Sequence, residues 1–373
     1  MMRKEFRIPD VPDVVVRKLT KLKDDQGCGE MTWGQWFAHL TKDVYLTDTA
    51  SELIQKHTRE GLLEIWIQNL AKNLPRIWEG KSIKSIVPAE TAKLDAEGKD
   101  PDKPTGTAVV VGRGPSLFEK KHLQMLAESD YRGNVVCTDG AMIEALKAGV
   151  KPENYENFFS VTVDGNPELI QKWYDHELVK EHGKHIKAVL CSSVAPNVPE
   201  VCEKNGVDIY YFHPLFDDYR NIESYTKIEQ FMTKCEKHPN GLPAMQAGGH
   251  AGATAWVLSW VVLRKSPIAL IGLNLGYTPE TPLESTYYWK GLMEATRGNM
   301  VLMQQAYTRI HNPDFNCDCI LDPVFAHYRE AFIDLVKATP KWTATWNCTE
   351  GGSLFSEEIK CAPFKEFLEA FKK

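Results

Sequence analysis

Residues 107–117 have the sequence TAVVVGRGPSL, in which an apolar run is followed by two glycines, a proline and a serine. An apolar run of this length is typical of a buried strand, and glycines allow the chain to turn tightly after it. Pro115 suits the first turn of a helix. We therefore expect a strand, a glycine turn and a helix in succession.

Apolar runs and amphipathic segments then alternate along the chain. Strands that are apolar on both faces and separated by helices indicate a parallel sheet that is covered on both sides. With right-handed crossovers, this pattern predicts an α/β fold: a doubly wound, mostly parallel Rossmann-like sheet. The expected strands are 107–111, 134–138, 158–163, 186–191, 207–212 and 267–273, and the expected helices lie around 116–128, 140–148, 167–181, 195–205 and 246–264.

Segments outside this pattern predict helical additions at both ends. Apolar residues between Ala50 and Trp78 are mostly three or four apart, as a helix with one buried face requires. A stretch rich in charge, proline and glycine follows it and is typical of a linker. The expected organisation is a helical region (1–85), a linker (86–105), a Rossmann-like domain (106–280) and a mainly helical region (281–373).

Composition narrows the class of protein. The 373 residues include 44 basic and 50 acidic ones, a net charge of −6, so no nucleic-acid partner is expected. Nine scattered cysteines, an odd number, indicate free thiols in a reducing compartment. No signal peptide or membrane span is visible, because the longest apolar run, near Ala253–Leu263, is shorter than the ~20 residues that a span needs. We therefore expect a cytoplasmic protein.

The glycine turn is the first candidate binding site. Gly112, Gly114, Pro115 and Ser116 are positioned to bring backbone N–H groups and a helix start close to a phosphate. Leu117 stands where a dinucleotide fingerprint has its third glycine, which disfavours NAD. The alternative is a plain strand-to-helix turn.

Two aspartates, Asp139 and Asp164, follow the second and third expected strands. The carboxyl ends of parallel strands meet at one edge, where open α/β sheets bind their ligands. We expect both carboxylates to line one crevice with the glycine turn and to bind ribose hydroxyls, a base amino group or a metal ion. The alternative is that each caps the following helix.

A second glycine-rich segment, QAGGHAGAT at 246–254, precedes the last helix of the pattern. Gly248 and Gly249 allow a ligand or another segment to approach closely. His250 at the helix start is a candidate general base or phosphate contact, and the alternative is a structural histidine.

Polar residues near two other strand ends complete the candidate site. Asn274 and Tyr277 follow the 267–273 run, and Thr349 and Glu350 lie in NCTEGG at 347–352, a turn that would reach back over the pocket. No metal site is expected: Cys317 and Cys319 lack a second pair at zinc-ligand spacing.

Several of these segments together resemble the MptE-like family, which includes archaeal 6-hydroxymethylpterin diphosphokinases and motility accessory factors implicated in flagellin glycosylation. The resemblance covers roughly residues 105–280 and a short tail. The GxGPSL element is also similar to the nucleotide loop of bacterial sialyltransferases that use CMP-activated sugars. Family members usually carry Asp where this chain has Asn274. The resembling segments are VVVGRGPSL (109–117), CTDGAMIEALKAGVKP (137–152), FFSVTVDGNPE (158–168), AGGHAGATAWVLSW (247–260), PIALIGLNLGY (267–277) and NCTEGGSLF (347–355).

The resemblance implies a nucleotide-dependent transferase, in the first place a glycosyltransferase that uses a CMP-type sugar. His250 and Asp164 would then be catalytic and the other candidates would bind the nucleotide. The alternatives are a diphosphokinase acting on 6-hydroxymethylpterin or a similar alcohol, which would need Mg²⁺ held by carboxylates, and a non-catalytic nucleotide-binding accessory protein. The implied partners are a nucleotide or nucleotide sugar, and a protein acceptor or a second copy of the chain.

Overall fold

The computed structural model describes residues 61–96, 104–215, 217, 220, 224–246 and 248–372, together with residues 18, 20, 21, 23 and 24. Residues Thr58–Lys373 form one compact unit. The helix predicted from Ala50 is described from residue 61, and it runs to residue 79. Its inner face buries Trp66, Leu70, Leu74 and Ile77, which confirms the expected spacing over this part. The other predictions for residues 1–60 lie outside the described residues, apart from the five residues between 18 and 24, which are helical.

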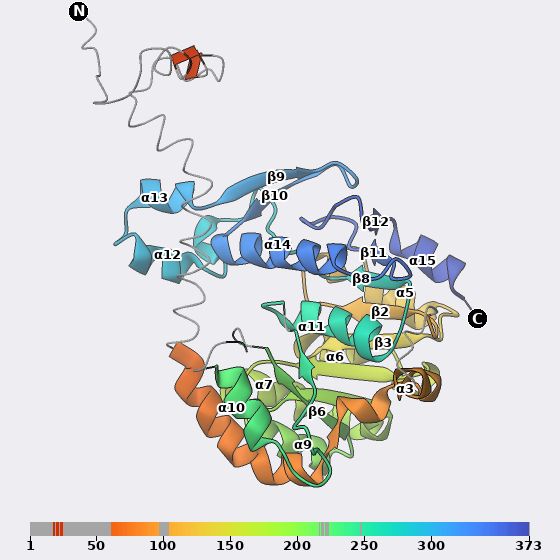
Figure 1. Cartoon of the computed structure of the whole chain (residues 1–373). Coiled ribbons are helices and arrows are strands. Elements are labelled where there is room, and N and C mark those ends of the chain that lie inside the picture. Colours follow the sequence, from red (N-terminus) through yellow and green to blue (C-terminus); the bar gives the residue numbers. More distant parts are fainter. Residues whose placement is uncertain are drawn as a thin grey trace, which may run out of the picture. The chain divides into compact units, whose positions relative to one another are not determined.

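The centre of the unit is a ten-stranded sheet in the order β1-β6-β5-β4-β3-β2-β8-β11-β12, with β7 paired to β6 (Figure 1). All its neighbouring strands are parallel. The strands are β1 (Lys81–Ser82), β2 (Ala108–Val111), β3 (Asn134–Thr138), β4 (Phe158–Thr162), β5 (Ile186–Cys191), β6 (Asp208–Pro214), β7 (Ala244–Met245), β8 (Ile268–Ile271), β11 (Thr345–Asn347) and β12 (Ile359–Cys361). A separate antiparallel hairpin joins β9 (Thr308–Asn312) to β10 (Cys317–Leu321).

The strand order reverses at β2. From β2 the chain moves outward through β3, β4, β5 and β6, and β8 then returns to the other side of β2. In open α/β sheets, ligands bind beyond the carboxyl ends of the strands at such a reversal. A ligand-binding site is therefore expected beyond the carboxyl ends of β2 and β8.

Helices cover both faces of the sheet. Right-handed crossovers place α5, α6, α7 and α9 on one face, and α11 packs on β2, β3 and β4 from the other. Phe332 of α14 lies 5.1 Å from Trp256 of α11, ring centre to ring centre. The helices are α3 (Ala89–Ala96), α4 (Ser116–Glu119), α5 (His122–Glu128), α6 (Asp139–Lys147), α7 (Pro167–Tyr174), α8 (Glu177–His182), α9 (Asn197–Lys204), α10 (Tyr225–Met232), α11 (Ala251–Val257), α12 (Trp289–Ala295), α13 (Met300–Gln305), α14 (Pro323–Lys337) and α15 (Phe364–Ala370).

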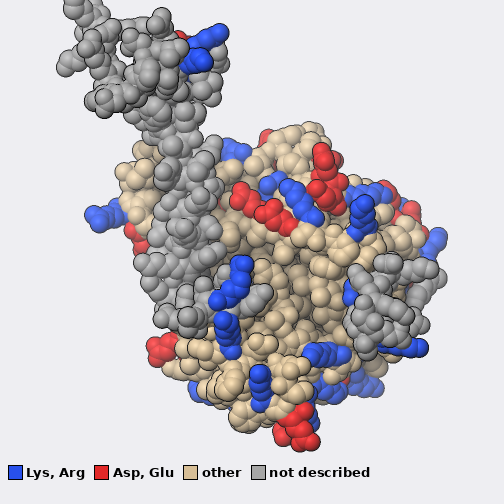
Figure 2. Space-filling model, in the orientation of Figure 1, with Lys and Arg blue, Asp and Glu red and all other residues tan. Residues whose placement is uncertain are grey.

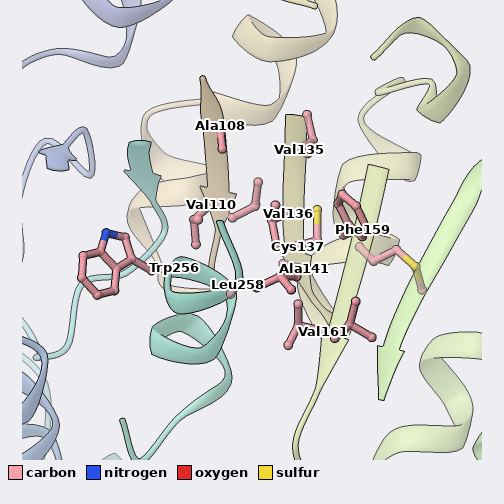
Figure 3. Packing of buried hydrophobic residues seen from close by; sticks show 14 of the residues in the cluster. Ala108, Val110, Val135, Val136, Cys137, Ala141, Phe159, Val161, Trp256 and Leu258 are labelled. Atoms are coloured by element: carbon pink, nitrogen blue, oxygen red, sulfur yellow. The ribbon is translucent and has the colours of Figure 1, made fainter. Parts of the chain in front are cut away.

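The main core lies between the central strands and α11. Val110 of β2, Val136 of β3 and Val161 of β4 are fully buried. Figure 3 shows them near Trp256 and Leu258, at the end of α11. Burial of apolar side chains stabilises this arrangement by about 25 cal/mol per Å² removed from water.

The structure confirms the predicted α/β fold class and all six predicted strands, with shifts of one or two residues at some ends. Three of the predicted helices differ in the structure, and one of them, 167–181, is divided into α7 and α8. Lys121 has a positive φ of 54° and separates α4 from α5, so the 116–128 helix is two short ones. The 246–264 helix begins at Ala251 and ends in a π-helical turn at Leu258–Val262.

The flanking regions contain elements that the sequence does not predict. The region after residue 280 carries four strands besides its helices, and two of them, β11 and β12, extend the central sheet beyond β8. The segment expected to be a linker contains α3.

The described residues also give the properties of the helices, the thiols and one face of the surface. No described helix has both the length and the apolar character needed to cross a bilayer. The eight cysteines within the described residues are all free thiols. On the face shown in Figure 2, basic and acidic side chains are both scattered among uncharged residues.

Candidate functional site

The loops after β2 and β8 are bound to each other at the reversal of the sheet. The Ser116 hydroxyl donates to Asn274 Oδ1 at 2.9 Å, and the Ser116 N–H points to the same oxygen at 3.4 Å. The amides of Gly112 and Gly114 donate to the carbonyls of Ile271 and Gly272, at 2.8 and 2.7 Å. The glycine turn is thus fastened to the neighbouring strand end.

The two glycines of the turn are needed for close packing. A Cβ on Gly112 would lie 2.5 Å from the Gly272 carbonyl oxygen, and one on Gly114 would lie 2.3 Å from Asn274 Oδ1. Pro115 caps α4 with helical backbone angles, and it is exposed. The amides of Gly112 and Gly114 already have hydrogen-bond partners. The Arg113 amide between them makes no hydrogen bond to a described residue.

Asp139 lies at the end of β3, as the first residue of α6. Its Oδ1 accepts from the Gly140 N–H at 2.6 Å. The side chain is partly buried. Burial raises the pKa of Asp139 to about 6, and the charge of Asp164 adds to the rise while Arg113 opposes it. Asp139 and Asp164 both follow strands at the carboxyl edge of the sheet, β3 and β4.

Asp164 lies in the loop after β4 and is held by the backbone. Its Oδ1 accepts from the Asn166 N–H at 2.8 Å. Asn69, from the helix over residues 61–79, donates to the Gly165 carbonyl at 2.9 Å and fixes the same loop. Burial raises the pKa of Tyr328 to about 12, and the charge of Asp164 contributes to that shift.

His250 is the N-cap of α11. Its Nδ1 accepts from the Ala253 N–H at 3.2 Å, and its ring centre lies 5.1 Å from that of Tyr328. Burial lowers the pKa of His250 to about 4, so the ring is neutral. A neutral ring that accepts at Nδ1 carries its proton on Nε2, which is buried and makes no hydrogen bond to a described residue. His250 is thus arranged as an N–H donor, and acting as a base would require the cap bond to break first.

Gly248 and Gly249 precede this cap and both have positive φ, 55° and 84°. A Cβ on Gly248 would lie 2.6 Å from that of Ala253, and one on Gly249 would lie 2.6 Å from the Tyr328 ring. The absence of a side chain at Gly249 allows the Tyr328 ring to pack against the start of α11, and Gly248 allows close packing against Ala253.

Two of the expected binding residues are engaged inside the protein. The Tyr277 hydroxyl donates to Asp322 Oδ2 at 3.0 Å and accepts from the Tyr287 N–H at 2.7 Å. Thr349 is fully buried, and its hydroxyl lies 2.6 Å from both Asn347 Oδ1 and the Gly351 carbonyl oxygen. The polar groups of these two side chains therefore bind other parts of the protein.

Glu350, a third expected binding residue, is also engaged within the protein. It has a positive φ of 53°, and its Oε1 is shared by two partners. That oxygen accepts from the Phe364 N–H at 3.1 Å and lies 3.2 Å from Nε2 of the buried His122. The carboxylate therefore joins α5 to the start of α15.

Arg113 is a charged residue at this edge that is not among the residues predicted from the sequence. Its guanidinium lies 4.8 Å from the ring centre of Trp173, and its stem passes so close to Gly140 that a Cβ there would lie 2.9 Å from Arg113 Cδ. Its side chain is half-exposed, and its Nη2 lies 3.7 Å from Glu144 Oε1. Its position between Gly112 and Gly114 is the sequence feature from which it could have been predicted. Among the described residues, no three His, Cys, Asp or Glu side chains gather as a metal site.

No family model and no curated protein matches the chain. A solved structure to which it is similar is that of the MAf glycosyltransferase from Magnetospirillum magneticum AMB-1, with 15% identity and a TM-score of 0.48. The similarity covers 72% of this chain and 36% of that one, so the chain spans about a third of that protein's length. A similarity this low does not assign an activity to this chain.

Proposed function

We propose that the chain is a nucleotide-dependent transferase, and specifically a glycosyltransferase that uses a CMP-type nucleotide sugar. The supporting observation is the convergence of polar groups from four neighbouring strand ends at the reversal of the sheet. Ser116 and Asn274 come from β2 and β8, and Asp139 and Asp164 come from β3 and β4.

The loops after β2 and β8 would hold the nucleotide. Asn274 Nδ2 makes no hydrogen bond to a described residue, and neither does the Arg113 N–H, so both are available as donors to phosphate or ribose oxygens. Gly112, Gly114 and Pro115 set the path of the loop, and Ser116 fixes the orientation of the Asn274 amide. The donors would thus be one side-chain amide and one backbone amide.

The catalytic groups would come from the β4 loop and the start of α11. Asp164 would contact the sugar or the acceptor hydroxyl from the loop after β4, where the Asn166 N–H holds its Oδ1. His250 would act through its Nε2–H, as a donor to the departing phosphate. Gly248, Gly249 and Tyr277 would shape the acceptor side, with Thr349 and Glu350 supporting the outer strands.

Ligand-induced changes in melting temperature test this proposal. The full chain would be melted with CMP, CDP, UDP, GDP and ATP, each with and without Mg²⁺. A ligand that binds only the folded state at ~100 times its Kd stabilises it by about 2.7 kcal/mol, which is measurable as a melting shift. We expect a response to CMP that does not need Mg²⁺.

The other outcomes separate the alternatives. A response to ATP alone, and only with Mg²⁺, would favour the diphosphokinase, and no response to any nucleotide would contradict the proposal. Asn274→Ala should remove most of the CMP response, because it deletes a donor of the loop. The matched control is Asn299→Ala, at the exposed N-cap of α13, which should lower the melting temperature but keep the CMP response.

A further inference from the structure

The guanidinium of Arg113 is positioned by two helices that cover one face of the sheet. It lies 4.8 Å from the ring centre of Trp173 on α7, and its Nη2 lies 3.7 Å from Glu144 Oε1 on α6. The stem crosses the start of α6, where a Cβ on Gly140 would lie 2.9 Å from Arg113 Cδ. Arg113 therefore extends from the loop after β2 to the first turn of α6, in which Asp139 is the first residue.

The hydrogen-bond donors of this guanidinium have no partner among the described residues. A guanidinium has five N–H donors, and the distance from Arg113 to Glu144 is too long for a hydrogen bond. The side chain is 49% exposed, so ligands in solution can reach it. Arg132, by contrast, donates to the carbonyls of Ser129 and Tyr131 at 2.9 and 2.7 Å. The guanidinium of Arg113 is thus held in place while its donors remain available.

The same guanidinium belongs to a cluster of basic side chains. Lys147 Nζ lies 3.6 Å from the Glu144 oxygen that Arg113 faces, and Lys172 Nζ lies 4.7 Å from the ring centre of Trp173. With Asp139 included, three cations stand against two carboxylates at this end of α6, in a chain whose net charge is −6. A local excess of positive charge attracts an anionic ligand.

The chemistry of Arg113 favours a phosphate as that anion. The planar fork of a guanidinium matches a phosphate group and can form two parallel hydrogen bonds to it. The backbone N–H of Arg113 also makes no hydrogen bond to a described residue. One residue therefore offers a fork and an amide at the loop where the sheet reverses. The ribose and the base of a nucleotide are uncharged, so they gain less from a fixed cation.

We propose that the guanidinium of Arg113 binds the phosphate group of the nucleotide and that Trp173 positions it for this contact. This inference rests on the proposed function, which supplies the nucleotide, and it adds the side chain that distinguishes a nucleotide from a nucleoside. A cation above an aromatic ring is attracted to the ring without using its hydrogen-bond donors. Trp173 can therefore orient the guanidinium and leave its fork to the phosphate.

The affinities of the full chain for CMP and for cytidine, measured by calorimetry, provide the first test. The two ligands differ only in the phosphate group. Arg113→Gln removes the cation, so the Kd for CMP should rise by about ten-fold or more, while the Kd for cytidine should stay within about two-fold. Arg113→Lys keeps the charge without the fork, and its Kd for CMP should lie between those of the wild type and Arg113→Gln.

The salt dependence of CMP binding gives a second readout. Raising the ionic strength from about 0.01 to about 0.15 M screens contacts between exposed charges. This change should weaken CMP binding by the wild type more than by Arg113→Gln. Equal salt dependence in the two proteins would contradict a charged contact between Arg113 and the phosphate.

Arg132→Gln is the matched control for Arg113→Gln. The side chain of Arg132 is 40% exposed, but it precedes β3 and therefore lies at the other end of that strand from Asp139. Its replacement should lower stability and leave both Kd values unchanged. If Arg113→Gln raises the Kd for CMP and the Kd for cytidine equally, the substitution disturbs the loop and the phosphate contact is overturned.

The positioning role of Trp173 is tested by a double-mutant cycle. Trp173→Leu should raise the Kd for CMP by about three- to five-fold, the ordinary contribution of a cation–π contact at an exposed site, and Trp173→Phe should recover most of the loss. In the Arg113→Gln background, Trp173→Leu should have no further effect, because the cation that it orients is absent. An equal loss in both backgrounds would mean that Trp173 acts on the structure alone.

The outcomes also separate this inference from the proposed function. If the wild type binds CMP and Arg113→Gln binds it with the same Kd, this inference fails and the proposed function stands. If the wild type binds ATP in place of CMP, the proposed function fails, and this inference stands only if Arg113→Gln weakens the binding of ATP more than that of adenosine. If the wild type binds no nucleotide, both fail.

Discussion

The Ser116 hydroxyl donates to Asn274 Oδ1 at 2.9 Å and thereby connects the two strand ends between which the sheet reverses. The same two loops exchange backbone hydrogen bonds through Gly112 and Gly114. The Ser116–Asn274 hydrogen bond is therefore formed before any ligand binds at this reversal. The orientation of the Asn274 amide, with Nδ2 left for a ligand, is a consequence of that contact.

Gly114→Ala should destabilise the protein. The new Cβ would lie 2.3 Å from Asn274 Oδ1 and 2.8 Å from the Gly272 carbonyl oxygen, and one of these is backbone that cannot simply rotate away. Overpacking of this kind costs about 1–3 kcal/mol. We expect a loss of that size in the free energy of unfolding, measured with urea.

Gly61→Ala is the control for that substitution. Gly61 is helical, and a Cβ there would meet nothing within 4 Å. Because alanine favours helices over glycine by up to ~1 kcal/mol, this variant should be as stable as the wild type or more stable. A Gly114→Ala protein of undiminished stability would show that the two loops are not closely packed at this position.

Asn274→Asp should keep the fold and weaken nucleotide binding. The carboxylate can still accept from Ser116, but it loses the Nδ2 donor and adds a negative charge next to the expected phosphate. We expect the Kd for CMP, measured by calorimetry, to rise by about ten-fold, which corresponds to ~1.4 kcal/mol. Asn299→Asp, which makes the same change at the N-cap of α13, should leave the Kd unchanged. Tighter CMP binding by Asn274→Asp would contradict the role given to Nδ2.

Long apolar runs made the central sheet predictable. Strands such as β2 and β8 are buried along their whole length, and every residue in them is apolar. The strands β11 and β12 have three residues each, and one of the residues of β11 is Trp346, which packs on Phe367. Three residues are too few to show a period, so tertiary pairing determines their conformation: β11 pairs with β8, and β12 pairs with β11.

The site was predictable only where topology determines it. Asp139 and Asp164 follow parallel strands, whose carboxyl ends lie at one edge of the sheet, so their place at that edge follows from the topology. The contact of the Tyr174 hydroxyl with Ser160 Oγ and Thr162 Oγ1 was not predictable, because both lie in an ordinary strand and Tyr174 follows them by fourteen and twelve residues. Nothing in the local sequence distinguishes a buried tyrosine with polar partners from one in an apolar core.

Substitutions at His250 should separate its capping role from its burial. His250→Asn keeps a side chain that can accept from the Ala253 N–H, whereas His250→Ala has none. The alanine variant should therefore be less stable than the asparagine variant by about 1 kcal/mol, the ordinary value of an N-cap, measured by urea unfolding at pH 7. Equal stabilities would contradict the capping role.

The pH dependence of the same variants tests the burial of His250. The pKa of His250 falls from 6.5 in the unfolded chain to about 4 in the folded one, so between these values the unfolded chain binds more protons. The free energy of unfolding should therefore fall as the pH drops from 6.5 to 4, and this fall should be smaller in His250→Asn. Melting temperatures from pH 4 to 7 would show it. His311→Asn, at a half-exposed histidine of β9, should follow the wild-type curve.

A buried acid of α10 predicts the opposite slope at higher pH. Glu229 is fully buried and accepts from the Ser192 hydroxyl through Oε1. Its Oε2 lies 4.0 Å from Nδ1 of His213, a ring that burial keeps neutral. Burial raises the pKa of Glu229 from 4.5 to about 8. The carboxyl is therefore protonated in the folded protein at neutral pH.

Glu229→Gln should stabilise the protein increasingly as the pH rises. Between pH 4.5 and 8 the folded wild-type chain holds a proton that the unfolded chain releases, so its free energy of unfolding falls as the pH rises through this window. Glutamine has no such titration and still offers an oxygen to Ser192. The melting temperature of the variant minus that of the wild type should grow from pH 5 to 8 and then level off. Glu79→Gln, whose side chain is 84% exposed, should give a difference near zero throughout. A constant difference for Glu229→Gln across this range would mean that Glu229 is ionised in the folded protein and that a cation or water stabilises it there.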